Sequence, residues 1–328
     1  MKFSNVVALA LLCSLSYCQD KVRVATWNLE WFSEDALPER IENVKSVLGT
    51  IKPDIIGVQE VQSLKALKQV FGDEWETATV DAEPEDQEPC IAVRKPYKIE
   101  EFAPVFKDEF YDFAFPGKRD VLRAVISAPG GAKFSVYVCH MKSRSGGRLQ
   151  TDPQREMAAA LLAGYISGHQ SENTIVLGDM NDAPDDRSMN ILESGDLLIK
   201  GGENSPGRLL VNLCDPLYRK DYVSFGLKPD LAGPVIEFSR SENERTRGID
   251  YKYPQDLKVT QILFDQILVS PRLAEGATPK IYNGADTLRG SFGRTRKDDN
   301  GRAVYSKKGT RPSDHCPVYV DLTVPAAQ

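Results

Sequence analysis

The sequence predicts an α/β fold, and three features of the chain support this prediction. Apolar stretches typical of strands alternate with helix-like stretches from Lys21 onward. The 328 residues are 41% hydrophobic and 27% charged, which excludes a collagen-like or disordered chain. No internal repeat or low-complexity linker interrupts the alternation. We therefore expect residues 19–328 to form a single domain.

Residues 1–18 are predicted to be a secretory signal peptide. MKFSNVVALALLCSLSYC has one early lysine, an apolar stretch at residues 6–12 and small residues near its end. It is too short to span a membrane, so we expect cleavage near Cys18, a secreted or periplasmic protein and no stable membrane insertion. Two alternatives are an N-terminal helix packed on the domain and a lipid anchor on Cys18. Tyr17 is a poor residue directly before a lipidated cysteine, which argues against the anchor.

The regular elements can be placed in order along the chain. Residues 22–27, VRVATW, are typical of a strand, and residues 38–51 are typical of a helix that begins at a proline and repeats apolar residues at helical spacing. Further strands are expected at residues 54–60, 90–94, 121–127, 134–140, 174–179, 264–270 and 317–324, and further helices at residues 63–71 and 152–167. The segments 200–255 and 275–312 are polar, rich in Gly and Pro, and unusually long for connections; such insertions are often functional.

Polar side chains of a few types follow the strongest strands. They are Asn28 and Glu30 in TWNLEWF, Glu60 in VQEV, His140 and Lys142 in HMKS, Asp179, Asn181 and Asp182 in GDMND, and Asp314 and His315 in SDHCPV. Residues two apart project to the same side of an extended strand, and ligands of α/β sheets bind where strand ends meet. A cap, a turn or a surface ion pair explains any one of these residues equally well. Their joint occurrence at strand ends predicts a shared site.

Cysteines are present but do not indicate a metal site. The six cysteines are widely spaced without a CxxC pair, so zinc is not indicated. Cys139 and Cys316 adjoin His140 and His315, which raises the alternative of a catalytic thiol. Because neighbours in a strand face opposite sides, we expect both thiols to lie in the core.

Six motifs in order resemble the endonuclease/exonuclease/phosphatase family: TWNLEWF, GVQEV, HMKS, GDMND, FDQILVS and SDHCPV, which together run from Val22 to Val320. The resemblance implies a four-layer α/β sandwich, in which two mixed β-sheets pack face to face with helices outside. It also implies hydrolysis of a phosphate ester with a divalent metal.

The resemblance also suggests a role for each matched residue. Glu60 is the first expected metal ligand, completed or supported by Asn28, Glu30 and Asp314. These oxygen donors suit Mg²⁺, with Mn²⁺ or Ca²⁺ as substitutes. The expected catalytic residues are Asp179, which aligns or deprotonates the water; Asn181, which holds the phosphate or that water; His140 and His315, which bond the non-bridging oxygens; and Asp265, which orients His315.

The basic segments bear on the substrate. The chain is acidic, with a net charge of −6, yet residues 289–311 hold eight Arg and Lys against two Asp, Arg294 and Arg296 among them. A second basic stretch, residues 142–148, includes Lys142 and Arg144, and Arg119 is a candidate phosphate contact. Basic loops beside a phosphodiesterase site would hold a nucleic-acid backbone. A solvated charged loop is the plain alternative.

We therefore expect an exported endonuclease that hydrolyses DNA and needs no protein partner. The alternative is a phospholipase C, sphingomyelinase or inositol-phosphate phosphatase of the same fold. A sphingomyelinase would want an exposed aromatic loop for membrane docking, and we expect none here. A non-catalytic binding protein ranks last because no motif position has been lost.

Overall fold

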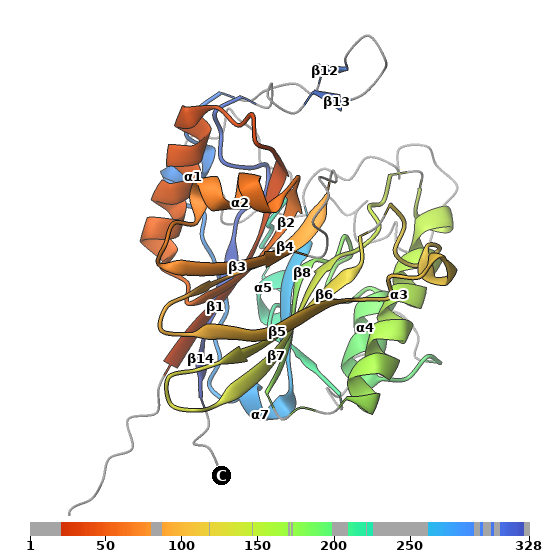
Figure 1. Cartoon of the computed structure of the whole chain (residues 1–328). Coiled ribbons are helices and arrows are strands. Elements are labelled where there is room, and N and C mark those ends of the chain that lie inside the picture. The colour runs from red at the N-terminus through yellow and green to blue at the C-terminus, as the bar shows by residue number, and fades with distance from the viewer. Residues whose placement is uncertain are drawn as a thin grey trace, which may run out of the picture.

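The computed structural model describes residues 21–79, 87–117, 119–145, 147–169, 171, 173–198, 209–220, 222–225, 262–291, 296–297, 303–304 and 309–324. The predicted signal peptide lies outside these residues. Two six-stranded sheets dominate the fold, and a separate two-stranded sheet pairs β12 (Arg296–Lys297) with β13 (Ala303–Val304). Figure 1 shows the two large sheets side by side, with helices on their outer sides.

The first sheet has the strand order β11-β14-β1-β2-β4-β3. Its strands are β1 (Lys21–Phe32), β2 (Ile55–Val61), β3 (Trp75–Thr79), β4 (Glu88–Arg94), β11 (Lys280–Ile281) and β14 (Val318–Thr323). β1 pairs parallel with β2 and antiparallel with β14, so the sheet is mixed. The parallel pairing brings the carboxyl ends of β1 and β2 to the same edge.

The second sheet has the strand order β5-β6-β7-β8-β10-β9. Its strands are β5 (Lys98–Val105), β6 (Val121–Ser127), β7 (Lys133–His140), β8 (Thr174–Asp179), β9 (Val211–Asn212) and β10 (Asp265–Val269). β7 and β8 run parallel and place His140 opposite Asp179, while β10 runs antiparallel and places Asp265 opposite the same Asp179. Three polar residues thus meet at one edge.

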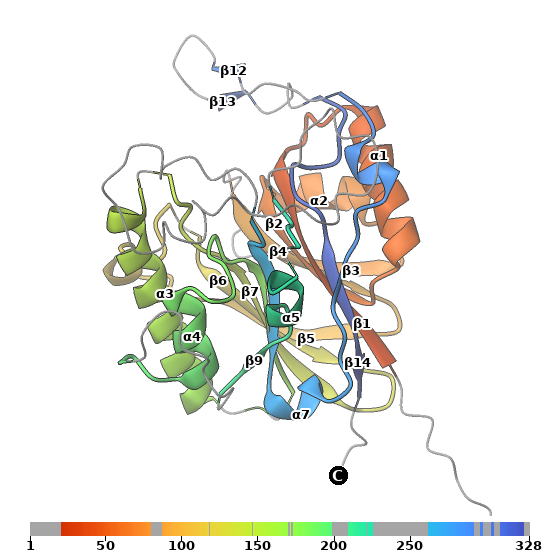
Figure 2. The same cartoon turned by 180° about the vertical axis from the view of Figure 1, so that it is seen from behind.

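Helices cover the outer faces of both sheets. α1 (Pro38–Ile51) and α2 (Leu64–Val70) lie on the first sheet, and α3 (Arg148–Gly168) and α4 (Arg187–Ser194) lie on the second (Figure 2). Shorter helices are η1 (Glu109–Tyr111), α5 (Asp215–Tyr218), α7 (Pro271–Ala274) and η3 (Ala285–Leu288). α1 begins at a proline, which lacks the N–H that a first helical turn leaves without an intrahelical acceptor.

Three apolar clusters hold these layers together. Between the sheets, Val24 and Ile55 of the first pack with Val138 and Leu177 of the second. The other two clusters join the first sheet to α1 and α2, and the second sheet to α3 and α4. Burying apolar side chains on both faces of each sheet is the main source of stability in such a fold. The predicted four-layer α/β sandwich with two mixed sheets is confirmed.

One glycine sets the geometry of the strand end that carries Asp179. Gly178 has φ +150°, and a Cβ atom there would lie 1.9 Å from the carbonyl oxygen of Cys139 in β7. Only glycine allows this approach of the two backbones at this φ. The absence of a side chain at Gly178 therefore lets β7 and β8 approach closely just before His140 and Asp179, and so sets the spacing of these two residues.

Candidate active site

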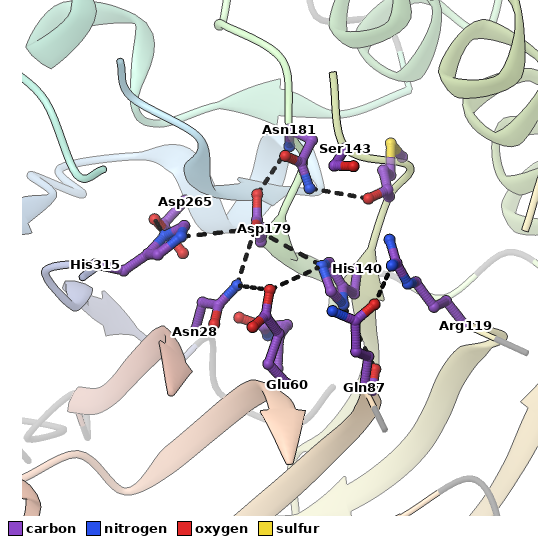
Figure 3. A network of polar contacts seen from close by, with 12 residues as sticks. Asn28, Glu60, Gln87, Arg119, His140, Ser143, Asp179, Asn181, Asp265 and His315 are labelled. Carbon is purple, nitrogen blue, oxygen red and sulfur yellow. Dashed lines mark hydrogen bonds and ion pairs between the residues drawn. The ribbon is translucent and has the colours of Figure 1, made fainter. Parts of the chain in front are cut away.

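The polar residues at the strand ends converge at one end of the two sheets (Figure 3). Asn28 and Glu60 come from β1 and β2, and His140 and Asp179 from the ends of β7 and β8. The set is completed by Asp265 at the start of β10 and His315 just before β14. The indole Nε1 of Trp27 donates to the carbonyl oxygen of His315 at 2.9 Å, which joins β1 to the segment that carries this histidine.

The backbone turns sharply at these strand ends. Glu30, Glu60 and Asn181 all have positive φ, at 47°, 58° and 52°. The side chains of Asn28 and Asp179 accept hydrogen bonds from the backbone N–H two residues later, at 2.8 and 2.9 Å. Asn and Asp favour turns for this reason, because their side chains bond the following backbone. The extended backbone assumed for the pairs Asn28/Glu30 and Asp179/Asn181 is therefore not found.

Asn28 lies between two carboxylates. Its Nδ2 donates to Oε1 of Glu60 at 3.1 Å and to Oδ2 of Asp179 at 3.0 Å. Its oxygen accepts one hydrogen bond from the N–H of Glu30 and keeps a second lone pair. The amide thus orients the two carboxylates in this structure, and the ligand role expected from the sequence stays a prediction.

Burial strongly perturbs the two carboxylates. Burial, together with the nearby charge of Asp314, raises the pKa of Glu60 to about 7. Burial likewise raises the pKa of Asp179 to about 6, against the opposing attraction of His315. Desolvation and like charges both penalise the ionised forms, and a bound cation would relieve both. Perturbations of this kind are typical of functional sites.

His140 faces both carboxylates across a gap. Its Nε2 lies 3.7 Å from Oε1 of Glu60 and 3.9 Å from Oδ2 of Asp179, too far for direct hydrogen bonds. On the other side, its Nδ1 lies 3.5 Å from the carbonyl oxygen of Gln87. Burial and the charge of Arg119 lower the pKa of His140 well below its usual range. This histidine is therefore neutral at physiological pH.

His315 has the opposite charge state. Its Nδ1 lies 2.6 Å from Oδ2 of Asp265, and the hydroxyl of Ser224 donates to the same oxygen at 2.7 Å. Burial alone would lower the pKa of His315, but the Asp265 carboxylate outweighs it and raises the pKa to about 10. Its Nε2 lies 3.9 Å from Oδ2 of Asp179. The site thus holds one neutral and one protonated imidazole around the same carboxylate.

Three of these residues fit a divalent cation. Glu60, His140 and Asp179 each offer one ligand atom, and these atoms all lie within 4.8 Å of one another. The two carboxylate oxygens suit Mg²⁺, Mn²⁺ or Ca²⁺, all of which prefer oxygen donors, whereas an imidazole nitrogen is a donor that transition metals accept more readily than Mg²⁺ or Ca²⁺ do.

The two other predicted ligands lie outside this cluster. Asp314 is partly exposed, with Oδ1 3.9 Å from Nε2 of His315, and its charge reaches Glu60. Glu30 is buried, and its charge acts on the guanidinium groups of Arg40 and Arg311. The structure thus places Asp314 beside the cluster and directs Glu30 toward arginines.

Arg119 lies on the far side of His140 from the carboxylates and donates to the side-chain oxygen of Gln87 (Figure 3). Its Nε and Nη1 are buried and have no hydrogen-bond partner among the described residues. Unpaired buried donors cost free energy unless a ligand satisfies them. Buried donors without a partner suit an anionic group, and the role of Arg119 as a phosphate contact stays a prediction.

The other predicted cations are placed differently. Nζ of Lys142 donates to its own loop, to Ser143 and to the carbonyl oxygen of Ser145. Arg144 is buried and ion-paired with Asp182 and Asp186, so the prediction that it binds substrate is not supported. Arg311, part of the predicted basic segment, is also buried. Arg294 and the side chain of Arg296 lie outside the described residues.

Asn181, Gln87 and Ser224 also contact the residues of the site. Asn181 is buried beside Asp179, and its Nδ2 donates to the carbonyl oxygen of Met141 at 2.9 Å. Gln87 and Ser224 were missed, because each sits in a polar segment with no motif and gains meaning only by touching His140 or Asp265. The thiols of Cys139 and Cys316 are fully buried, as expected; Cys139 lies in β7, whereas Cys316 precedes β14 and is outside any strand. All four cysteines of the described residues are free.

The two stacked sheets and the acidic and histidine side chains at one end define a deoxyribonuclease I-like α/β sandwich. The chain belongs to the Endonuclease/Exonuclease/phosphatase family, whose sequence model matches residues 25–315. Members of this family are phosphoric ester hydrolases. No curated protein matches the chain in sequence.

Solved structures share the fold at low sequence identity. TDP2 of D. rerio, complexed with a single-stranded DNA product, is 17% identical with a TM-score of 0.57, over 92% of this chain and 98% of that one. The mannosyl-6-phosphatase of Bacteroides thetaiotaomicron is 16% identical with a TM-score of 0.58, over 92% and 99%. Another family protein from Bacteroides thetaiotaomicron is 15% identical with a TM-score of 0.58, over 92% and 97%.

Within the described residues, no helix is both long and apolar enough to cross a membrane.

Proposed function

We propose that the protein is a divalent-metal-dependent phosphodiesterase and that DNA is its substrate. One observation carries the proposal. The acidic cluster of Glu60 and Asp179 suits a cation, and the buried donors of Arg119, across His140 from this cluster, suit an anion. A site that needs both at once fits a phosphate ester with its metal.

Each residue then has a defined task. A divalent cation held by Glu60 and Asp179, with Nε2 of His140, would supply charge to the phosphate oxygens. The bound cation would favour the ionised form of Asp179, whose carboxylate accepts the proton of the attacking water. The imidazolium of His315 donates from Nε2 to a non-bridging oxygen, and Asp265 holds its Nδ1 side. Nε and Nη1 of Arg119 bind the remaining oxygens. His140 here is a nitrogen ligand rather than the phosphate donor expected from the sequence.

Two further observations support nucleic acid as the substrate. The basic segment 289–311 leads directly into Asp314 and His315, although most of its side chains lie outside the described residues. A protein of the same fold, TDP2, has been solved with a single-stranded DNA product. A cationic segment beside the site would bind a nucleic-acid backbone with strong salt dependence.

A lipid phosphodiesterase is the second candidate, and a specific observation favours it. The expectation that the chain has no exposed aromatic loop is wrong. Phe110 and Phe113 are 85% and 55% exposed on the segment 106–115, which precedes Arg119 in the chain. Phe106 and Phe115 of the same segment stack at 4.9 Å and anchor it to the core. Exposed aromatic side chains on an anchored loop suit insertion into a membrane interface.

Export is a further part of the proposal and rests on residues 1–18 alone. Expression of the full chain in a bacterial host, followed by fractionation and mass determination, tests it. We expect a processed form outside the cytoplasm, and an unprocessed cytoplasmic form when residues 1–18 are deleted. An unprocessed full chain in the cytoplasm would contradict export.

Plasmid nicking tests the proposed activity. The purified protein is incubated with supercoiled DNA and Mg²⁺, with EDTA, and as an Asp179→Ala variant. We expect nicking only with metal and intact Asp179; a covalently closed circle can be opened only by an endonuclease. The same samples are offered sphingomyelin, inositol phosphates and mannose 6-phosphate. Turnover of a lipid without nicking would replace the first candidate by the second.

A further inference from the structure

Six charged side chains beside the active site, five of them buried and one, Asp186, partly buried, form a closed ring, called here the arginine–aspartate ring. Its members are Arg144, Arg148, Arg155, Asp152, Asp182 and Asp186. Each arginine bridges two aspartates and each aspartate bridges two arginines. Three positive and three negative charges alternate around the ring, so it is neutral. It is thus fully compensated without any ligand.

The ring is well packed as well as neutral. Arg144 and Arg155 contact the two oxygens of Asp182 at 3.1 and 2.8 Å. Nη2 of Arg148 lies 2.6 Å from Oδ1 of Asp186. Arg155 is fully buried and Asp182 is 2% exposed. Charged groups are this deeply buried only when they are paired, and the ring pairs every member twice.

The ring joins three separate pieces of chain. Arg144 belongs to the loop after β7, and Asp182 and Asp186 belong to the loop after β8. The other three members lie in the first turns of α3. Both loops follow directly from catalytic strand ends, since β7 ends at His140 and β8 ends at Asp179. The ring therefore fastens the two loops to each other and to one rigid helix.

Direct hydrogen bonds lead from the ring into the active site. Nε of Arg144 donates to the carbonyl oxygen of Asn181 at 3.0 Å, and Nη1 of Arg155 donates to that of Lys142 at 2.8 Å. Asn181 has a left-handed backbone, which is strained for a residue other than glycine and needs support from its surroundings. The bond from Arg144 to the carbonyl oxygen of Asn181 supplies such support, next to the turn in which Asp179 accepts from the N–H of Asn181.

We propose that the arginine–aspartate ring is a positioning device for the hydrolytic reaction, and that catalytic rate depends on the ring being closed. No ring member touches the substrate in this proposal. The ring holds the loop of Asn181 against the loop of Lys142, and so sets Asp179 and Asn181 at a fixed distance from His140. Small misplacements of reacting groups are costly in rate, so an open ring would leave a folded but slow enzyme. This inference rests on the proposed hydrolytic function.

Two conservative variants open the ring without removing charge. Lysine can pair with one carboxylate but cannot bridge two with a planar fork. Arg148 contacts only the ring carboxylates, so Arg148→Lys perturbs no active-site bond directly. Arg144→Lys opens the ring and also removes the bond to Asn181. We expect kcat for bis(p-nitrophenyl) phosphate with Mg²⁺ to fall about 10-fold for the first and about 100-fold for the second, with KM nearly unchanged.

Arg23→Lys is the matched control. Arg23 also forks onto a carboxylate, that of Asp321, and donates to the carbonyl oxygen of Ile51. It lies five residues before Asn28 on β1, about 17 Å away along an extended strand. We expect a lower melting temperature but an unchanged kcat. All rates are measured well below each variant's melting temperature, so that only folded enzyme is compared.

Amide hydrogen exchange supplies a readout that does not need turnover. In Arg148→Lys we expect faster exchange in residues 141–145 and 180–186, and unchanged exchange in β1 and β14. A normal kcat in both ring variants, with only a lower melting temperature, would reduce the ring to a stabilising element and overturn the proposal. If the wild-type protein hydrolyses neither DNA nor the diester, the proposed function fails instead. Exchange then still decides whether the ring holds the two loops, and unchanged exchange would refute it.

Discussion

The short segment of residues 179–186 contributes carboxylates to two groups of charged side chains, the active site and the arginine–aspartate ring. The two groups differ in how fully their charges are paired. In the arginine–aspartate ring, every carboxylate contacts two guanidinium groups, as Asp182 does at 3.1 and 2.8 Å. In the active site, the carboxylates of Glu60 and Asp179 both accept from the amide of Asn28. The Nε2 atoms of the two histidines lie 3.7 to 3.9 Å from the carboxylate oxygens, beyond hydrogen-bond distance. Every carboxylate of the ring is paired with arginines, whereas the carboxylates of the active site leave space for a ligand.

The protonation behaviour follows from this difference. Burial alone would raise the pKa of Asp186, but Arg144 and Arg148 overcome it and hold the pKa well below its usual range. Burial raises the pKa of Glu60 and Asp179 without enough compensation. Asp182 of the same ring differs from Asp186, because burial raises its pKa although Arg155 and Arg144 oppose the rise. The number of guanidinium contacts, rather than the direction of the pKa shift, therefore distinguishes the ring carboxylates from those of the active site.

The largest expected effect separates Asp179 from Asp182, three residues further along the chain. Asp179→Ala should lower the hydrolytic rate roughly 10²–10⁴-fold, because it removes the general base. It should change stability little, because removal of a buried carboxylate with a raised pKa offsets the loss of the hydrogen bonds from Asn28 and Asn181. Asp182→Ala should cost about 3–5 kcal/mol of unfolding free energy, because it leaves Arg144 and Arg155 without their shared partner. Urea unfolding and initial rates measure both.

His315→Ala extends the same comparison. We expect a rate loss of similar size, roughly 10²–10⁴-fold, from the missing imidazolium. Circular dichroism should show a folded protein. Near-normal rates in either Asp179→Ala or His315→Ala would remove the catalytic assignment of that residue.

A smaller effect should appear in the response to metal and pH. Mg²⁺ at 100 times its dissociation constant stabilises a protein by about 2.7 kcal/mol. Because protons compete with the cation for Glu60 and Asp179, whose pKa values are about 7 and 6, this gain should be largest at pH 8 and shrink toward pH 5.5. Thermal unfolding with Mg²⁺ and with EDTA measures the difference at each pH.

The direction without metal follows from the same pKa values. Glu60 and Asp179 bind protons more tightly in the folded than in the unfolded chain, where their values are 4.5 and 3.8. Their contribution to stability in EDTA therefore rises as the pH falls from about 7 toward 4.5. His140, whose pKa is lowered, acts the other way below pH 6.5. A gain from Mg²⁺ that did not change between pH 8 and 5.5 would place the cation elsewhere.

The sequence predicted the fold well because strong apolar runs carry it. All strands and helices expected between residues 22 and 324 are present within a few residues. The strand β5 was missed because most of it is exposed at a sheet edge, so KIEEFAPV lacks a hydrophobic run. The helix α4 was missed because its eight residues, RSMNILES, span barely two turns and hold three large apolar side chains, too few to establish a helical repeat.

The site was predictable in its members but not in their arrangement. Motif order placed Glu60, Asp179 and His315 together. It could not show that the backbone turns after Asn28, so that Glu30 leaves the cluster. Nor could it separate an arginine that is ion-paired from one that has unpaired donors. Arg144 and Arg119 look alike in sequence, and only their partners among the described residues distinguish them.

The smallest expected effect concerns the thiols next to the two histidines of the site. Cys139 adjoins His140 and Cys316 adjoins His315 in sequence, yet both thiols are fully buried in the core. Burial raises the pKa of each thiol to about 12, so almost no reactive thiolate exists at neutral pH. Iodoacetamide should therefore leave activity unchanged over hours, while the urea-unfolded protein is labelled at every cysteine. Rapid inactivation of the folded enzyme would contradict this prediction. It would mean that the backbone beside His140 or His315 opens enough for iodoacetamide to reach Cys139 or Cys316.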